Sequence, residues 1–310
     1  MQTDSATCDI AIIMTCHNRK NTTLACLKSL FNQSYLWHIR LTIYLVDDGS
    51  SDGTSEAVSK TYPSIHIIRG SGDLYWNRGM HRGFTQAIQN NHGFYLWLND
   101  DVILTSTTVQ TLLNCYARNH HKDEIGPVIV GAFGSEELNQ NTTETSEISY
   151  AGIKRTSSRW FPRTFRAYSS TLDLACDTFL GNGVLIPSDV ALKVGNINPI
   201  FHHALGDMDY GYRCASQSIK ILVCKEIIGY CTNDISNTKL YSNMAQGTWT
   251  TLPLVQRLNL IMSPKNFPLK GWLFFSYRYL GWLWLVRFAK PYILAIFPNL
   301  ISHSRVRENT

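Results

Sequence analysis

The sequence predicts an α/β fold with a mostly parallel sheet and helices on its faces, and three observations support this prediction. Short apolar runs of strand length alternate with apolar residues at helical spacing through the first 100 residues. This strand–helix–strand order implies parallel strands joined by crossover helices. Two of the runs stop at acidic clusters, and such sheets bind ligands beyond the carboxyl ends of their strands.

The first half of the chain contains four apolar runs that predict strands. They lie at residues 9–14, 41–46, 65–68 and 93–98. Helices are expected between them, one through Leu24, Leu27, Leu30 and Phe31 and two more over 51–60 and 77–90. Ser51 or Asp52 is expected to cap the second of these helices.

The chain changes character after residue 134. The polar, aperiodic stretch 135–147 predicts an exposed loop. A helix capped by Ser188 and a helix that begins near Leu205 and runs to Ser218 are expected further on. Short strands are expected at 148–154, 163–169, 172–179, 184–187 and 219–224. The pattern predicts a mixed second half, about 135–250, beside a first half of about 1–134.

Composition and charge narrow the class of protein. The 310 residues are 44% hydrophobic and 16% charged, which is typical of a globular domain and excludes disorder. The net charge of +5 is uneven: from Thr251 onward there are eight basic residues and one acid, which leaves 20 basic and 22 acidic residues elsewhere. This balance gives no support for a nucleic-acid partner, whereas the basic tail suits an anionic membrane surface.

The eight cysteines are scattered and form no CxxC pair. In a chain of this size they indicate reduced, mostly buried thiols. The N-terminus also lacks a basic stretch followed by a long apolar one, so no signal peptide is expected. Both features predict a cytoplasmic location.

Two acidic clusters follow predicted strands. Asp47 and Asp48 could accept hydrogen bonds from a base or a ribose, although an Asp that ends a strand and caps the next helix is the simpler explanation. Asp100 and Asp101 repel each other, and a divalent cation would relieve that repulsion and bind a diphosphate. An Asp-rich turn is the alternative here.

A third acidic cluster opens a predicted helix. Asp207 and Asp209 could supply a carboxylate base for an acceptor hydroxyl. Acids in a first helical turn also interact favourably with the helix dipole, which explains most such cases.

Together and in this order, several stretches resemble bacterial family 2 glycosyltransferases with the GT-A fold. The resemblance extends over roughly residues 9–232. Within the family, the chain is similar to the rhamnosyltransferase-like branch that builds O-antigen and capsule polysaccharides. The matching stretches are 12–19 (IIMTCHNR), 46–54 (VDDGSSDGT), 98–101 (LNDD), 181–187 (GNGVLIP) and 206–213 (GDMDYGYR).

The resemblance assigns roles to the acidic clusters. It implies that Asp101 binds a divalent cation, Mg²⁺ or Mn²⁺, and that Asp207 is the base, with Asp209 as the alternative. The sequence departs from the family pattern at Asn99, where the metal motif starts with an acid, and at Gly206, where a Glu is usual.

The resemblance also implies a donor site and an acceptor site. Segment 70–79 lies where the family places a glycine- and asparagine-rich donor segment, although a structural loop with Asn77 as a helix cap is an alternative. The donor residues expected are Thr15, Asn18, Arg19, Asp47, Asp48, Asp73, Asn77, Arg78, Asn99 and Asp100. The acceptor residues expected are Gly181, Asn182, His203 and Trp249.

The reaction implied by the resemblance is a single displacement that inverts the anomeric carbon. The expected donor is a UDP- or dTDP-sugar, and the expected acceptor is a glycan or a saccharide linked to polyprenyl diphosphate. Residues 1–250 would form the GT-A catalytic domain, with a donor half at about 1–134 and an acceptor half at about 135–250. Residues 251–310 would form a C-terminal helical extension.

The C-terminal segment 268–297 is rich in aromatic and basic residues. Its apolar stripe predicts one strongly aromatic helical face, made of Trp272, Phe275, Tyr279, Trp282 and Val286. Its charge-free core is too short to span a bilayer of about 30 Å, but the composition suits a lipid interface. We expect peripheral contact with the cytoplasmic face of the inner membrane. A helix packed on the domain or in a dimer is the alternative, and the oligomeric state stays open.

Three other functions are less well supported. A sugar nucleotidyltransferase would carry a glycine-rich loop after the first strand, where this chain has Thr15-Cys16-His17-Asn18-Arg19. A Rossmann dehydrogenase would carry GxGxxG at the same place. A non-catalytic nucleotide- or carbohydrate-binding relative would be expected to lose Asp101 or Asp207, and both are present.

Overall fold

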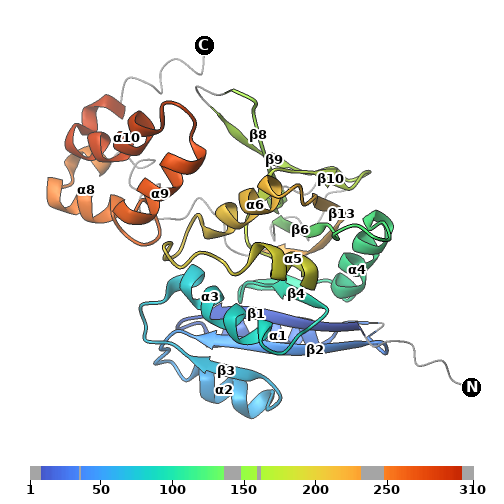
Figure 1. The fold of residues 1–310 in the computed structure, drawn as a ribbon. Helices are drawn as coiled ribbons and strands as arrows, with labels where there is room; N and C mark the ends of the chain where they lie inside the picture. The colour runs from blue at the N-terminus through green and yellow to red at the C-terminus, as the bar shows by residue number, and fades with distance from the viewer. Residues whose placement is uncertain (1–7, 35, 136–147, 159–161, 232–247, 302–310) are drawn as a thin grey trace, which may run out of the picture.

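A computed structural model describes residues 8–34, 36–135, 148–158, 162–231 and 248–301. Its centre is a ten-stranded mixed sheet with the strand order β10-β13-β6-β12-β4-β1-β2-β3, to which β5 and β7 add by pairing with β13 and β6 (Figure 1). A second sheet has the order β11-β8-β9. The predicted loop 135–147 lies, apart from Ser135, outside the described residues.

The first half follows the predicted alternation of strands and helices. All four predicted strands form, and β1 pairs in parallel with both β2 and β4 while β2 pairs in parallel with β3. The elements are β1 (Cys8–Cys16), α1 (Lys20–Phe31), β2 (Ile39–Asp47), α2 (Thr54–Thr61), β3 (His66–Arg69), α3 (Tyr75–Ile88) and β4 (Phe94–Trp97). Helix α2 starts later than predicted, because Gly53 is the cap residue, with φ 81°. Asp52 accepts the Thr54 N–H at 3.1 Å.

The end of the first half contains three elements that the sequence pattern did not predict, β5 (Val102–Leu104), α4 (Thr108–Asn119) and β6 (Val128–Ser135). Two predicted strands are each divided between the two sheets. Region 148–154 gives β7 (Ile148–Tyr150) and β8 (Gly152–Arg155), and region 172–179 gives β10 (Leu174–Ala175) and β11 (Thr178–Phe179). The remaining elements are β9 (Thr164–Ala167), β12 (Val184–Pro187), α5 (Ser188–Val194), α6 (Gly206–Ser216) and β13 (Ile221–Cys231). Ser188 is the first residue of α5 and does not cap it, because Pro187 holds the cap position.

Strand β12 connects the two halves of the sheet. It runs antiparallel to both neighbours, with Val184 opposite Trp97 of β4 and opposite Val130 of β6. The start of an antiparallel strand lies at the edge where its neighbours end. The loop before β12 therefore joins the ends of β1, β2 and β4 at one edge of the sheet.

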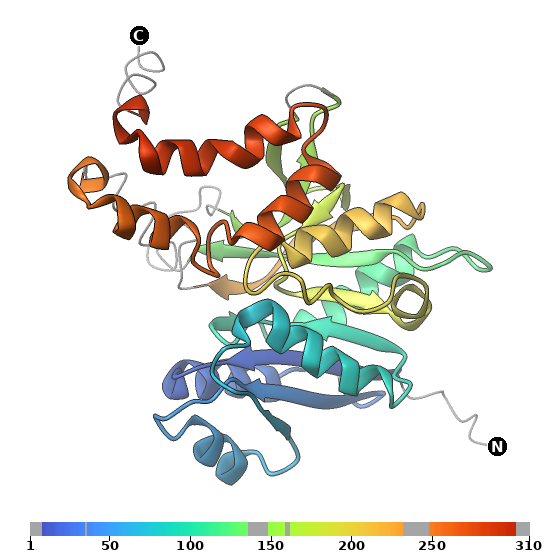
Figure 2. The ribbon, with the colours of Figure 1, turned by 60° about the vertical axis from the view of Figure 1, so that its left-hand side comes forward.

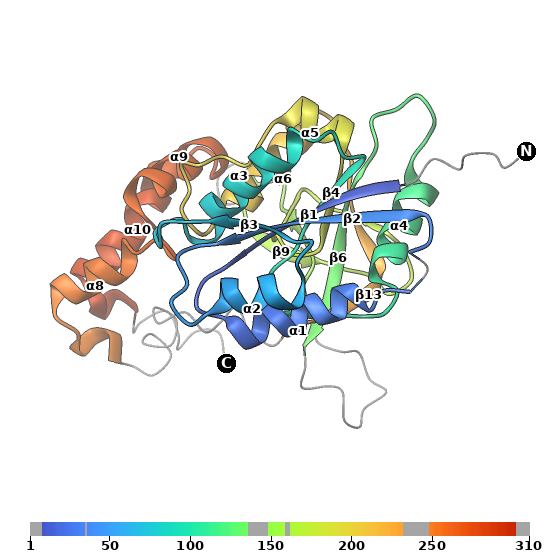
Figure 3. The same ribbon diagram turned by 90° about the horizontal axis from the view of Figure 1, so that it is seen from below.

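Helices cover both faces of the sheet and enclose two apolar cores. On one face α3, α5 and α6 bury Phe84, Val190 and Tyr210 against the strands. On the other face α1, α2 and α4 bury Leu27, Val58 and Leu112. Figure 3 shows α3 and α5 on the opposite side of the strands from α1 and α2.

The C-terminal helices gather at one side of the molecule, next to α6 (Figure 1, Figure 2). They are η3 (Thr248–Thr251), α8 (Leu254–Ile261), α9 (Leu269–Tyr279), α10 (Trp284–Ile296) and η4 (Pro298–Ile301). Gly281, with φ 77°, lies between α9 and α10. The predicted continuous aromatic face is therefore wrong: Trp272 and Phe275 are buried, whereas Trp282 and Val286 are exposed. Among the residues described, no helix is long and apolar enough to cross a membrane.

Helix α9 packs onto the α/β domain through one face. Trp272 and Phe275 form an apolar cluster with Phe201, from the loop before α6. In addition, the Tyr279 hydroxyl donates a 2.6 Å hydrogen bond to Asp209 of α6. A hydrogen bond to a charged partner typically stabilises a fold by about 1.5–3 kcal/mol, so this bond is a substantial part of the attachment.

Tyr279→Phe should lower the free energy of unfolding by about 1–3 kcal/mol, because it removes one donor from a buried carboxylate. Urea denaturation measures the difference. Tyr277→Phe, on the exposed face of the same helix, is the matched control and should change stability by less than about 0.5 kcal/mol. Equal stability of the two variants would contradict this view of how α9 is attached.

Candidate active site

Four loops meet at the edge of the sheet where β1, β2 and β4 end and β12 begins. They carry most of the site residues expected from the sequence: 15–19 after β1, 47–53 after β2, 98–101 after β4 and 181–183 before β12. The meeting point follows from the strand directions, because parallel strands end at the same edge and an antiparallel strand starts there.

Two adjacent carboxylates dominate this edge. Asp100 and Asp101 are both buried, and one nitrogen of Arg19, Nη1, donates to Asp100 Oδ1 at 2.9 Å and to Asp101 Oδ2 at 2.8 Å. Thr23 donates a further hydrogen bond to Asp100 at 3.3 Å. Burial, and next the negative charge of Asp101, raise the pKa of Asp100 to about 6, although Arg19 opposes the shift. The site thus concentrates negative charge that a single guanidinium balances only in part.

The loops after β1 and β2 are tied together. Asp47 is buried and accepts the Ser50 N–H at 2.9 Å and the Ser55 hydroxyl. Asn18 Oδ1 accepts the Ser51 N–H at 2.8 Å. Thr15 is buried at the end of β1 and donates to a main-chain carbonyl of β2 at 3.3 Å. These contacts give the two loops one fixed shape beside the carboxylate pair.

Asp48 shapes the segment that follows β3. One of its oxygens accepts the Gly72 N–H at 2.8 Å, and the other accepts the N–H groups of Leu74 and Tyr75 at 2.9 Å each. Both carboxylate oxygens therefore bind the protein main chain, and Asp48 fixes the shape of this loop. Asp73, in the same loop, is exposed.

A chain of contacts links the carboxylate pair to α6. The Trp76 indole N–H donates to Asn99 Oδ1 at 2.8 Å, and the Asn99 N–H donates to Asn182 Oδ1 at 3.1 Å. The Gly181 N–H then donates to Asp207 Oδ2 at 2.8 Å. A Cβ at Gly181 would lie 2.3 Å from the Trp76 ring and 3.1 Å from Asp207 Cβ, so only glycine allows both to pack there.

Asp207 is fixed at the start of α6. Its other oxygen, Oδ1, accepts the Met208 N–H at 2.8 Å, and burial raises its pKa above the ordinary value. The pKa of Tyr150 is also raised, first by burial and then by the negative charges of Cys231, Asp101 and Asp207. Asp101 and Asp207 thus both act electrostatically on the Tyr150 phenol.

Asp209 is not a suitable base. Its side chain is fully buried, and its two oxygens bind Arg213 Nε at 2.9 Å and the Tyr279 hydroxyl at 2.6 Å. The Tyr279 contact holds α9 on α6, and both carboxylate oxygens are engaged, so the structure corrects the expectation that Asp209 could take a proton from an acceptor.

Gly181, Asn182 and Asn77 also take other roles than those expected from the sequence. Gly181 and Asn182 are buried and position Asp207 and Asn99, so they are not exposed to an acceptor. Asn77 is buried within α3, where its amide donates to the carbonyls at positions 198 and 201, at 2.8 and 2.9 Å. It therefore neither caps the helix nor reaches a donor.

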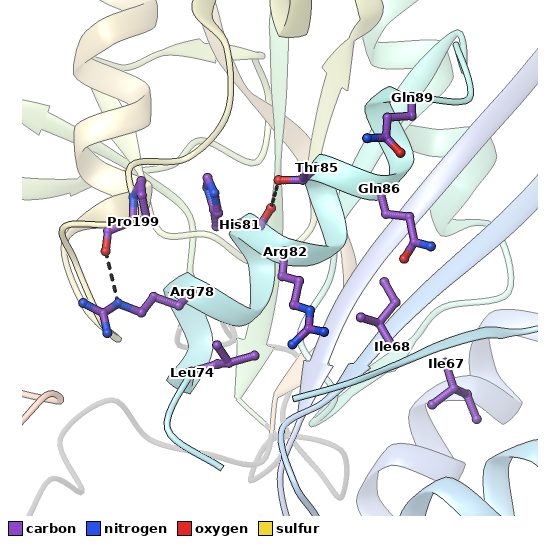
Figure 4. A pocket seen from close by; sticks show the side chains of 10 residues that line it. All are labelled: Ile67, Ile68, Leu74, Arg78, His81, Arg82, Thr85, Gln86, Gln89 and Pro199. Atoms are coloured by element: carbon purple, nitrogen blue, oxygen red, sulfur yellow. Dashed lines mark hydrogen bonds between the residues drawn. The ribbon is translucent and has the colours of Figure 1, made fainter. Parts of the chain in front are cut away.

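Arg78 lies on the outer side of α3. Its Nε donates to the Pro199 carbonyl at 3.1 Å, and its side chain lines a groove of about 730 Å³ between α3 and the edge strand β3 (Figure 4). His81 and Arg82 line the same groove, whereas the carboxylates at the end of β4 do not. Arg78, expected to bind the donor, therefore lines a groove that does not include the carboxylate pair.

Trp249 is a core residue. Its side chain is buried in an apolar cluster with Ile261 and Ala295, and its indole N–H donates to the Leu294 carbonyl at 3.4 Å. The expectation that Trp249 binds an acceptor is therefore wrong, because the residue holds the C-terminal helices together.

His203 is influenced by two positively charged side chains, Lys265 and Arg19. Burial, followed by the positive charges of Lys265 and Arg19, lowers the pKa of His203 to about 4, so this imidazole is neutral at pH 7. Its ring also contacts the Tyr75 ring edge to face, with the centroids 6.3 Å apart. No motif in the sequence marks Lys265 or Tyr150, because each reaches the site from a distant segment.

One group of side chains elsewhere has the composition of a metal site. Among the described residues, Cys115, Asp173 and Cys224 bring a ligand atom each to within 4.8 Å of one another. Arg118 already fills this cluster, with Nε 2.5 Å from Asp173 Oδ2 and Nη2 3.8 Å from Cys224 Sγ. Its positive charge makes a second cation there unfavourable.

Comparisons with known proteins agree with this arrangement. A family model described as Glycosyl transferase family 2 matches residues 11–181, more than half of the chain. The structure of S. aureus TarS 1–349 is similar, with a TM-score of 0.50 and 15% identity over 94% of this chain and 82% of that one.

A longer S. aureus TarS structure gives a TM-score of 0.51 and 14% identity over 97% of this chain and 53% of that one, so the present chain spans about half its length. Among curated proteins no match to the sequence is found. At these identities the structural likeness shows the fold alone. The family model confirms the expected class of enzyme and disfavours the nucleotidyltransferase and dehydrogenase alternatives.

The shifted pKa of Asp100 predicts a pH-dependent stability. The pKa of Asp100 is about 6 in the folded chain, above the ordinary 3.8. As the pH rises, Asp100 therefore ionises in the unfolded chain before it ionises in the folded one. The contribution of Asp100 is therefore fully present below about pH 4 and decreases by on the order of 2–3 kcal/mol as the pH rises through about 6. Urea denaturation in EDTA should show Asp100→Asn gaining stability relative to wild type between pH 4 and 7. A difference that is independent of pH would contradict the shift.

Proposed function

Because the chain belongs to glycosyl transferase family 2, we propose that this glycosyltransferase moves a sugar from a UDP- or dTDP-sugar to an acceptor hydroxyl, with inversion at the anomeric carbon. One observation supports the proposal: Gly181 donates to Asp207 and packs against Trp76, and Trp76 donates to Asn99, the residue before Asp100 and Asp101. In a displacement reaction, the base would take the proton of the attacking hydroxyl, and the acidic pair would hold a cation beside the leaving group.

The nucleoside would lie against the loops after β1 and β2. Thr15 and Asp47 are positioned there, and the contacts of Asn18 and Asp48 hold the loops in one shape. Fixed loops lose little conformational entropy when a ligand binds. This supports a donor site that exists before the nucleotide arrives.

The diphosphate would lie near the carboxylate pair. Asp101, supported by Asp100, would hold a Mg²⁺ or Mn²⁺ ion, since both are oxygen ligands and their mutual repulsion already raises the pKa of Asp100. When bound, the ion would neutralise the charge that develops on the leaving nucleoside diphosphate. Arg19, whose side chain is 43% exposed, and the exposed Lys265 offer further positive charge on this side.

Asp207 would accept the proton of the attacking hydroxyl. The N–H groups of Gly181 and Met208 fix its orientation, and burial raises its pKa, which makes the carboxylate a better proton acceptor. The neutral His203 imidazole can exchange hydrogen bonds with sugar hydroxyls from the same segment.

The acceptor would be a bacterial surface-polysaccharide intermediate, as in O-antigen or capsule synthesis, either free or linked to polyprenyl diphosphate. Exposed apolar residues occur in the C-terminal segment, among them Trp282 between α9 and α10 and Leu285 and Val286 on α10, and the two helices also carry Lys270, Arg278 and Lys290. Apolar and basic residues together favour the surface of an anionic membrane. We therefore extend the proposal to peripheral contact through residues 268–297, on the cytoplasmic side.

Donor hydrolysis in the absence of an acceptor tests the chemistry. A panel of UDP- and dTDP-sugars is incubated with enzyme and Mn²⁺, and the released nucleoside diphosphate is measured. Wild type should hydrolyse at least one donor, and Asp207→Asn should be slower by about 10²–10⁴-fold while still binding the nucleotide, because only the base is lost.

Asp123→Asn is the matched control, since it makes the same change at an exposed turn and should keep the wild-type rate. Hydrolysis by Asp207→Asn at the wild-type rate would refute the assigned base. Nucleotide binding with no hydrolysis of any donor would favour a non-catalytic relative instead.

A further inference from the structure

The outer side of α9 forms a narrow apolar groove with the start of α10. The groove, here named the α9 groove, has a volume of about 470 Å³. Its lining residues are Ile200, Lys270, Leu273, Phe274, Tyr277 and Trp284.

Helix α9 has two apolar faces, and the second is only partly used in folding. Trp272, Phe275 and Ser276 are buried on the domain side. The groove residues of α9 follow the spacing i, i+3, i+4, i+7 from Lys270 to Tyr277, which places them on one helical face. On this second face Phe274 packs against Phe201, with the ring centroids 5.8 Å apart, whereas Leu273 and Tyr277 stay exposed.

Two apolar side chains of the groove are exposed, and the Phe274 and Trp284 rings are half-buried. Tyr277 is 71% exposed and Leu273 is 42% exposed, and the Tyr277 and Trp284 rings meet edge to face with centroids 5.4 Å apart. Exposed apolar side chains arranged in a concave surface favour an apolar ligand.

Positive charge flanks the groove. Lys270 lines it, and the Arg278 guanidinium lies 5.9 Å from the centroid of the Phe274 ring. Neither side chain has an acidic partner among the ion pairs of the described residues. A ligand with an apolar chain and an anionic head would therefore match both the lining and the charges.

The groove borders the segment that leads to the active site. Ile200 lines the groove, and the carbonyl of His202 accepts the N–H of Asn77 at 3.0 Å, at the start of α3. His203 follows directly and lies near Arg19. A chain held in the groove would thus have its head group close to the loop that enters the site.

We propose that the α9 groove binds the isoprenoid chain of a diphosphate-linked acceptor, an inference that rests on the proposed transferase function. A flat bilayer surface fits less well, because the groove is concave. Exposed apolar residues such as Val255 and Val286 lie outside it. The groove would select acceptors by their lipid, while Asp207 acts on their sugar.

Photolabelling of the full chain tests this proposal. The probe is farnesyl diphosphate with a benzophenone at the end of its chain, used without vesicles, and labelled peptides are identified by mass spectrometry. The label should fall within residues 269–287 and be competed by farnesyl diphosphate but not by inorganic diphosphate. Tyr277→Asp should weaken labelling by about tenfold or more, because it places a charge in the apolar lining.

Val255→Asp is the matched control, since it puts the same charge on an exposed apolar site outside the groove, and it should label like wild type. Equal loss in both variants, or label outside residues 269–287, would overturn the proposal. The rise in Tm that a nucleotide causes is measured on the same samples, so that the test of the transferase function is separate from the test of the groove. Absence of this rise in wild type would count against the transferase function, whereas absent labelling would count against the groove alone.

Discussion

Strand β12 runs antiparallel between β4 and β6, and the active site depends on this pairing. Because Val184 lies opposite Trp97, the loop before β12 meets the loop after β4. Asn182 can then accept the Asn99 N–H, and Gly181 can donate to Asp207. A parallel β12 would start at the opposite edge of the sheet and would separate the second half of the chain from the carboxylates of the first.

The electrostatics of the site follow from this geometry. The fold buries two neighbouring carboxylates, and a single Arg19 nitrogen bonds to both of them. On the other side burial raises the pKa of Asp207, and burial together with positive neighbours lowers the pKa of His203. The result is a pair of carboxylates, a further carboxylate with a raised pKa and a neutral imidazole, which the proposed transfer would use to hold a cation, accept a proton and bind hydroxyl groups.

The sequence predicted the first half of the fold well, because β1 to β4 and their helices are local patterns. The acidic clusters were also found, since strand ends can be read from the chain alone. Asp209 could not be assigned, because its partner Tyr279 lies 70 residues away. Trp249 is buried by residues of α8 and α10, and no short motif records such contacts.

The C-terminal segment shows the same limit. Its aromatic spacing suggested one continuous helical face, but Gly281 interrupts the helix and turns the two halves in different directions. One face of α9 then packs on Phe201, while the other faces the groove. Periodicity reveals that a face is apolar, but the partner that covers it is fixed only by the tertiary fold.

The most direct test of the central claim is a thermal-shift titration with UDP, dTDP, GDP and CDP, each in Mn²⁺ and in EDTA. A ligand that binds only the folded chain raises Tm. The account predicts that UDP or dTDP raises Tm in Mn²⁺, that EDTA abolishes the effect, and that Asp101→Ala no longer responds. A chain that responds to no nucleotide in either condition, or an Asp101→Ala variant that responds like wild type, would contradict it.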